Sequence, residues 1–149
     1  MKNLLVVLSL MLATGFTSAK AGGGETDPRA EKLFAKQFTG AENVKWTRLS
    51  NGYLKVAFTL NGSGAISYFD GNAQLLGTAR NLLYSQLPFA VVQGLQQEYP
   101  GGIVIEVLEI INAEGTNYKV VLEKGNKKYS IKLNTLGEIK EERSVRLKK

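Results

Sequence analysis

One order of elements occurs twice along the chain, and this repeat constrains the fold more than any other feature of the sequence. In each half, apolar residues at helical spacing are followed by four short runs in which apolar and polar residues alternate. The run Tyr53–Phe58 in the first half aligns with Asn117–Leu122 in the second. The repeat predicts two copies of one unit, each of which buries its apolar face poorly when alone.

The first predicted helix begins at Asp27-Pro28, where a capping carboxylate precedes a proline in the first turn, and it ends at Gly40. From Asn43 the period changes to two, which is typical of strands that are buried on one face. Trp46 shares its strand parity with Val44, so we expect it in the core rather than stacked on a ligand. The expected turns between the strands are Asn51-Gly52, Asn61-Gly62 and Asp70-Gly71-Asn72.

The second helix is predicted to begin at Leu87-Pro88 and to stop at Pro100-Gly101-Gly102. Four more alternating runs follow, separated by turns at Gly115, Gly125-Asn126 and Gly137. The fold class is therefore α+β, with two tandem helix-plus-four-strand antiparallel units. We expect one domain over residues 27–149, made of two repeats at about 27–84 and 85–149.

The N-terminus has the three parts of a cleavable signal peptide. Lys2 supplies the positive start, Leu4–Ala13 form a mostly apolar run, and Ala19-Lys20-Ala21 provide the small-x-small cleavage pattern. We therefore expect a signal peptide over residues 1–21, a flexible leader over 22–26, and a mature protein in the periplasm or outside the cell. No later stretch is long and apolar enough to span a bilayer.

The sequence contains neither cysteine nor histidine. This removes thiol and imidazole chemistry, and with it the usual nucleophile–base pairs and the common zinc, copper and iron ligands. The carboxylate pairs Glu106/Glu109 and Glu141/Glu142 stand at odd spacing in predicted strands, which directs their side chains to opposite faces. Asp70 is expected to accept backbone amides in its turn rather than to bind calcium. We predict no catalytic residues, no metal site and no cofactor.

The formal net charge is +6, and it falls to about +4 once Lys2 and Lys20 are removed with the signal peptide. The basic residues are spread along the strands, apart from a C-terminal cluster of Lys140, Arg143, Arg146, Lys148 and Lys149. A nucleic-acid module has a denser basic stripe and a recognisable motif. We therefore expect no nucleic-acid partner and a solvated C-terminal segment.

The organisation resembles PepSY-like proteins of the beta-lactamase-inhibitor-protein-like fold, in particular the small exported proteins of Bacteroidetes. The residues that show the resemblance are Phe38, Ala41–Trp46, Tyr53–Phe58, Tyr68–Gly71, Leu87-Pro88, Tyr118–Val120 and Gly137. They are packing and turn residues, and they say almost nothing of activity, since fold does not imply function. The resemblance implies tandem helix-plus-sheet units whose sheet can form a concave protein-binding face.

Strand alternation predicts which residues such a face would present. If helices cover the side of Leu54, Val56 and Phe58, the opposite side is open. The binding residues expected on this open face are Tyr53, Lys55, Thr59, Ser67 and Phe69. Aromatic residues mixed with lysine are typical of a protein-binding patch, although the second half or a further strand could also cover this side.

The favoured function is a non-catalytic binding or regulatory module, with inhibitor-like action as one form, whose partner is a periplasmic or extracellular protein. One alternative is an envelope structural or stress protein without a specific ligand. A second is an enzyme that uses carboxylates or a lysine, which would require a deep polar pocket with converging glutamates.

Overall fold

The computed structural model describes residues 26–148. The predicted signal peptide and nearly all of the predicted leader lie outside the described residues. The first half consists of helix α2 (Pro28–Gln37) and strands β1 (Glu42–Arg48), β2 (Leu54–Leu60), β3 (Ser63–Phe69) and β4 (Leu75–Asn81). The second half begins with a short 3₁₀-helix, η2 (Tyr84–Gln86), and helix α3 (Phe89–Glu98). Strands β5 (Ile103–Asn112), β6 (Gly115–Lys124), β7 (Lys127–Asn134) and β8 (Ile139–Arg146) complete it.

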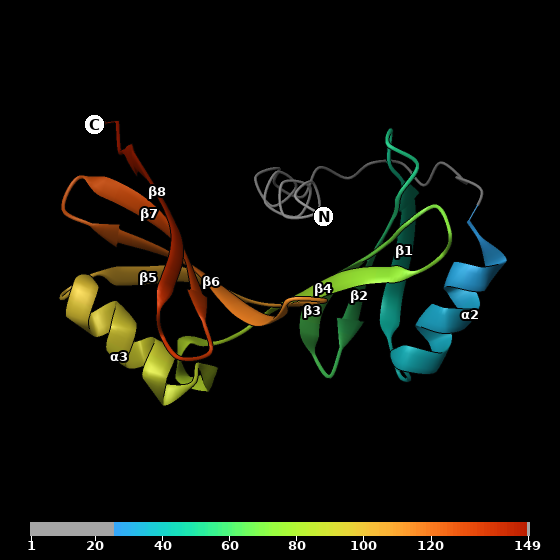
Figure 1. Cartoon of the computed structure of the whole chain (residues 1–149), viewed down its shortest axis with the longest axis horizontal. Helices are drawn as coiled ribbons and strands as arrows, with labels where there is room; N and C mark the ends of the chain where they lie inside the picture. The colour runs from blue at the N-terminus through green and yellow to red at the C-terminus, as the bar shows by residue number, and fades with distance from the viewer. Residues whose placement is uncertain (1–25, 149) are drawn as a thin grey trace.

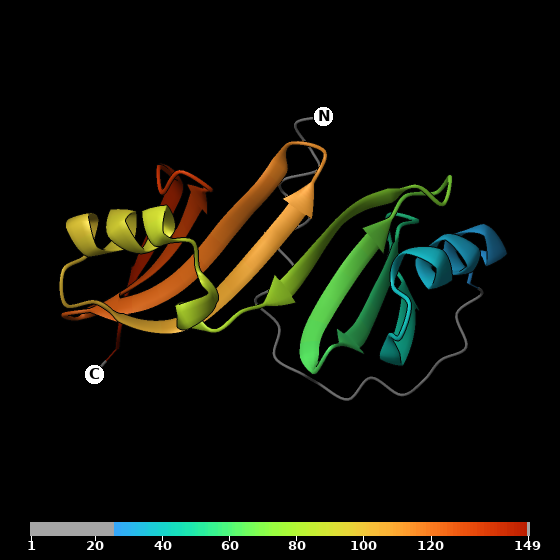
Figure 2. The same cartoon turned by 90° about the horizontal axis from the view of Figure 1, so that it is seen from below.

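All eight strands form one antiparallel sheet in the order of the sequence, from β1 to β8. The two halves meet where β4 pairs with β5, from Gly77 opposite Asn112 to Asn81 opposite Leu108. The helices lie at opposite ends of the molecule, α2 beside the first four strands and α3 beside the last four (Figures 1 and 2). The α+β class and the antiparallel strands expected from the sequence are confirmed, and the two sets of strands join into a continuous sheet.

Local chemistry explains where the first elements begin and turn. Asp27 caps α2, since its carboxylate accepts a hydrogen bond of 2.9 Å from the backbone N–H of Arg29. The Arg29 side chain also donates to this carboxylate and holds the pKa of Asp27 down at about 2. Between β2 and β3, Asn61 and Gly62 both have positive φ, 50° and 77°. This is the tight hairpin turn that Asn-Gly predicts.

Two hydrophobic cores lie on the same face of the sheet. Ala30 and Phe34 of α2 pack on β2 and β3, while Val91 and Leu95 of α3 pack on β5, β6 and β7. Residues directly opposite each other on paired strands share a face. Ala65 of the first core is opposite Arg80, Arg80 is opposite Glu109, and Glu109 is opposite Tyr118 of the second core. Both helices therefore cover one face, which we call the helix face.

Trp46 lies at the edge of the first core. It is half-buried, and its ring centroid lies 5.5 Å from that of Phe34 and 5.6 Å from that of Phe69. It is opposite Val56 across the β1–β2 pair, so it faces the helix side. Trp46 thus packs against the core, as expected. Val44, which was expected to face the same side as Trp46, is 41% exposed. It lies within the stretch from Glu42 to Lys45 where the pairing of β1 with β2 shifts register.

Helix α3 approaches the β7–β8 turn so closely that two glycines are required. A Cβ added to Gly94 would lie 2.2 Å from the carbonyl oxygen of Gly137. A Cβ added to Gly137, whose φ is +80°, would lie 2.1 Å from the carbonyl oxygen of Ala90. Backbone atoms cannot rotate out of the way, so this contact fixes α3 against the far end of the sheet.

Candidate functional site

Two of the five predicted binding residues lie on the wrong face. Ser67 and Phe69 are fully buried, each with 0% exposure, and both face the helices. Phe69 belongs to the first hydrophobic core and is directly opposite Leu54. Ser67 is opposite Val56, and its hydroxyl lies 2.8 Å from the hydroxyl of Thr78 on β4. The prediction that these two side chains lie on the open face is therefore wrong.

The hairpin turn explains the error. Because Asn61-Gly62 forms a two-residue loop, Leu60 is paired with Ser63, and the register then places Phe58 opposite Ala65 and Leu54 opposite Phe69. Since alternate residues of a strand share a face, Ala65, Ser67 and Phe69 of β3 must all face the helices. The signal that would have placed β3 correctly was present in the sequence, since this loop length sets the register.

The face opposite the helices, which we call the helix-free face, begins with the other predicted residues. Lys55 and Thr59 of β2 are half-buried and alternate with the core residues of that strand. They are opposite Tyr68 and Gly64 of β3, and Ala57 between them is opposite Ile66. Tyr53 is half-buried in the turn before β2, where its carbonyl accepts from the N–H of Leu49 at 2.8 Å. Ile66 and Tyr68 thus take the places that Ser67 and Phe69 were expected to occupy.

Apolar side chains continue along the helix-free face across the middle of the sheet. Ile66 is opposite Ala79 of β4, and Ala79 is opposite Ile110 of β5. The buried side chains of this apolar floor are Tyr68, Ala79, Leu108 and Ile110, with exposures of 3%, 4%, 3% and 6%. None of them belongs to either core cluster on the helix face. Burial raises the pKa of the Tyr68 phenol.

In the second half, the helix-free face is charged. Lys119 of β6 is directly opposite Lys132 of β7, and Lys132 is opposite Glu141 of β8. The Lys132 amino group is 3.9 Å from the Glu141 carboxylate. Lys119 and Lys132 therefore place two positive charges next to each other beside the apolar floor. Like charges directly opposite each other on neighbouring strands are destabilising.

The helix face has a polar strip between its two cores. Arg80 of β4 and Glu109 of β5 form an ion pair through the guanidinium Nε. The Arg80 side chain is 52% exposed and that of Glu109 only 11%, so the cation faces outward and the acid lies behind it. The Tyr118 phenol lies beside this pair, and burial together with the Glu109 carboxylate raises its pKa.

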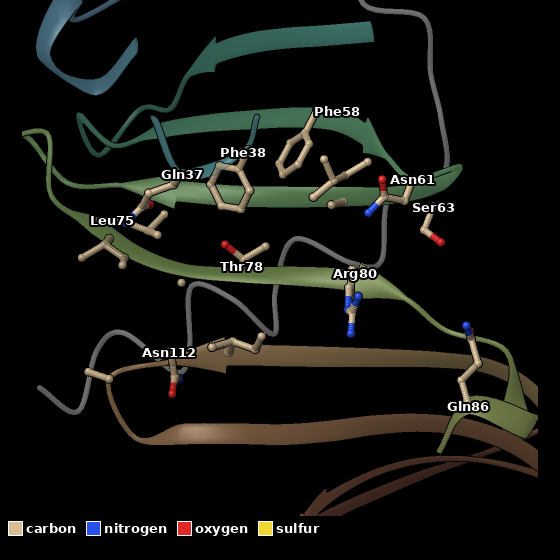
Figure 3. A pocket seen from close by; sticks show the side chains of 16 residues that line it. Gln37, Phe38, Phe58, Asn61, Ser63, Leu75, Thr78, Arg80, Gln86 and Asn112 are labelled. Atoms are coloured by element: carbon tan, nitrogen blue, oxygen red, sulfur yellow. The ribbon is translucent and has the colours of Figure 1, made fainter. Parts of the chain in front are cut away.

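A cleft of about 850 Å³ opens on the helix face over this strip, between the end of α2 and η2 (Figure 3). Phe38 and Phe58 lie on one side of it, and Arg80 and Gln86 toward the other. Its lining also includes Asn61, Ser63, Leu75, Thr78, Ile111 and Asn112. No pattern in the sequence predicts this cleft, because its walls come from segments far apart in the chain.

Few charged side chains converge at the cleft. Arg80 is the only charged side chain among the described residues that line the cleft. Glu106 and Glu109 lie on opposite faces of β5, since the first is opposite Val121 and the second opposite Tyr118. In the described part of the chain, no group of three or more Asp, Glu, His or Cys side chains could hold a metal ion. The Asp70 carboxylate accepts from the backbone N–H groups of Asn72 and Gln74 at 2.9 and 2.8 Å, as expected for a turn.

Over residues 26–148, no helix has both the length and the apolar character that crossing a membrane requires.

Several solved structures share the fold. A BLIP-like protein from Bacteroides fragilis superposes with a TM-score of 0.72 at 24% identity, over 85% of this chain and 93% of that one. A DUF2874 family protein from Bacteroides uniformis superposes with a TM-score of 0.73 at 24% identity, over 80% and 90% of the two chains. A protein of Bacteroides eggerthii, described as a candidate periplasmic protein, reaches 0.74 at 19% identity over 83% and 91%. Neither a family model nor a curated protein matches the chain. Similarity at these identities shows the fold.

Proposed function

We propose that this chain, which has the fold of the BLIP-like proteins, is a non-catalytic module that binds a protein through the helix-free face of its sheet. We further propose that it acts in the periplasm or outside the cell, as the N-terminal sequence pattern and the description of one structural neighbour both suggest. The observation that supports the binding role most strongly is the helix-free face itself. Among the described residues, both helices pack on the other side, which leaves one broad face of the continuous sheet for a partner.

The composition of this face favours a protein partner. Half-buried Lys55 and Thr59 border the buried apolar floor in the first half, and Lys119 and Lys132 border it in the second. Side chains with 3–6% exposure offer little contact area, so a partner would meet the partly exposed side chains around the floor, half-buried Ile66 among them. Lys132 already lies 3.9 Å from Glu141, so Lys119 is the cation that predicts an acidic side chain on the partner.

Site-specific photocross-linking in cells tests this proposal. A photoreactive residue at Thr59 on the helix-free face is compared with one at Lys36, which is exposed in the last turn of α2. We expect a discrete cross-linked protein from Thr59 and none from Lys36. A cross-link of equal yield and identity from both positions, or no discrete product from Thr59, would contradict the proposal and favour an envelope structural role.

A further inference from the structure

The cleft between the two cores has the walls of a small-molecule site. Six of its lining residues are large and apolar: Phe38, Phe58, Leu60, Leu75, Leu76 and Ile111. Its volume of about 850 Å³ falls within the range of about 300–1,000 Å³ that is usual for ligand pockets. The helix-free face lies on the other side of the sheet, so ligand binding in the cleft is independent of the proposed protein-binding role.

Among the described residues that line the cleft, Arg80 is the one that carries a charge. Arg80 uses its Nε–H to bind Glu109, and the remaining N–H groups belong to a side chain that is 52% exposed. Glu109 is not part of the lining, so a molecule in the cleft meets the guanidinium rather than the carboxylate. Guanidinium groups bind carboxylates and related anions through several N–H donors at once. Gln86, on the same side of the cleft, can donate a further hydrogen bond from its amide (Figure 3).

We propose that this cleft binds an amphipathic carboxylate, with an extended apolar chain along Phe38, Phe58 and Ile111 and an anionic head at Arg80. The large apolar side chains of the lining favour a ligand with an extended apolar part, because burial of apolar surface is a main source of affinity. Arg80 favours an anionic head over a cationic one through the N–H groups that its ion pair with Glu109 does not use. The occupant is thus a molecule of the size and chemistry of a medium-chain fatty acid.

Calorimetric titration with decanoate tests the proposal, with decyltrimethylammonium as a probe that has the same chain and the opposite charge. We expect saturable binding of decanoate, at least about tenfold tighter than that of the cation, which corresponds to about 1.4 kcal/mol. Nitrogen–proton NMR spectra recorded during the titration should show the shifts concentrated at Thr78 and Ile111. Absence of saturable decanoate binding, or equal affinity for both probes, would overturn the proposal.

Three variants distinguish specific binding from general adsorption. Ile111 and Ile103 both lie in β5 and are 46% and 70% exposed, but only Ile111 lines the cleft. Ile111→Asp should weaken decanoate binding at least about tenfold, since it places a carboxylate at the rim, whereas Ile103→Asp should leave it unchanged. The paired variant Arg80→Met, Glu109→Gln removes the cation without leaving its buried partner charged, and it should abolish the preference for decanoate. If Ile111→Asp and Ile103→Asp bind alike, or the paired variant keeps the preference, decanoate does not use this cleft.

Discussion

Gly94 in α3 lies against the β7–β8 turn, and replacing it with alanine sets two effects of opposite sign against each other. Alanine is favoured over glycine inside a helix by about 1 kcal/mol. The added Cβ, however, would lie 2.2 Å from the carbonyl oxygen of Gly137, 3.1 Å from its carbonyl carbon and 3.3 Å from its Cα. Since all three are backbone atoms, either the helix or the turn must move.

Overpacking of this kind costs about 1–3 kcal/mol, and a shift of packed backbone falls in the upper part of that range. We therefore expect Gly94→Ala to lower the free energy of unfolding by about 1–2 kcal/mol after the propensity gain is subtracted. With a urea m-value of about 1.5 kcal/mol/M, the unfolding midpoint should fall by about 1 M.

The assay is urea unfolding followed by circular dichroism, with Gln96→Ala as the control. Gln96 is exposed in the same helix, so its replacement should change stability by less than about 0.5 kcal/mol. A Gly94→Ala protein as stable as the wild type, or more stable, would refute the close packing of α3 on the turn.

Three further predictions follow from the burial and the charges of the two faces. Phe69→Ala should cost about 3–5 kcal/mol of stability because the ring is fully buried, while Phe89→Ala, at a ring that is 75% exposed, should cost less than about 1 kcal/mol in the same unfolding assay. Because the pKa of Tyr68 is raised in the folded state, its contribution to stability is complete below the usual pKa of 10.0 and is lost as pH rises through the folded value; the loss of unfolding free energy between about pH 9 and about pH 11 should therefore be smaller in Tyr68→Phe than in the wild type, and equal losses would contradict it. Glu109→Gln should lower the pKa of Tyr118, measured by NMR titration of its ring, because the carboxylate beside the phenol is removed; an unchanged pKa would exclude this contact.

Much of the fold could be predicted from the sequence, because its signals are local. Asp27-Pro28 marks the start of α2 through a cap that involves only neighbouring residues, and Asn61-Gly62 marks a turn that both residues accept at positive φ. The two-residue alternation identified the strands in both halves. The error at Phe69 arose because β3 was assigned to its face without using the register that this turn imposes.

The features that the sequence did not show depend on contacts between distant segments. The cleft brings Phe38 of α2 together with Ile111 of β5, and no local pattern predicts that the two cores leave a gap between them. The pairing of β4 with β5 joins the halves into one sheet and places Arg80 opposite Glu109. Neither residue alone indicates a partner across that junction.

Binding of a protein partner to the helix-free face can be measured by charge reversal, with the cross-linked partner in purified form. Lys119→Glu changes this face beside the apolar floor, while Lys36→Glu changes the same charge on the exposed side of α2. We expect Lys119→Glu to weaken partner binding about tenfold or more, with a stronger effect at low salt, and Lys36→Glu to leave the affinity unchanged. Equal affinities for both variants and the wild type would contradict binding through this face.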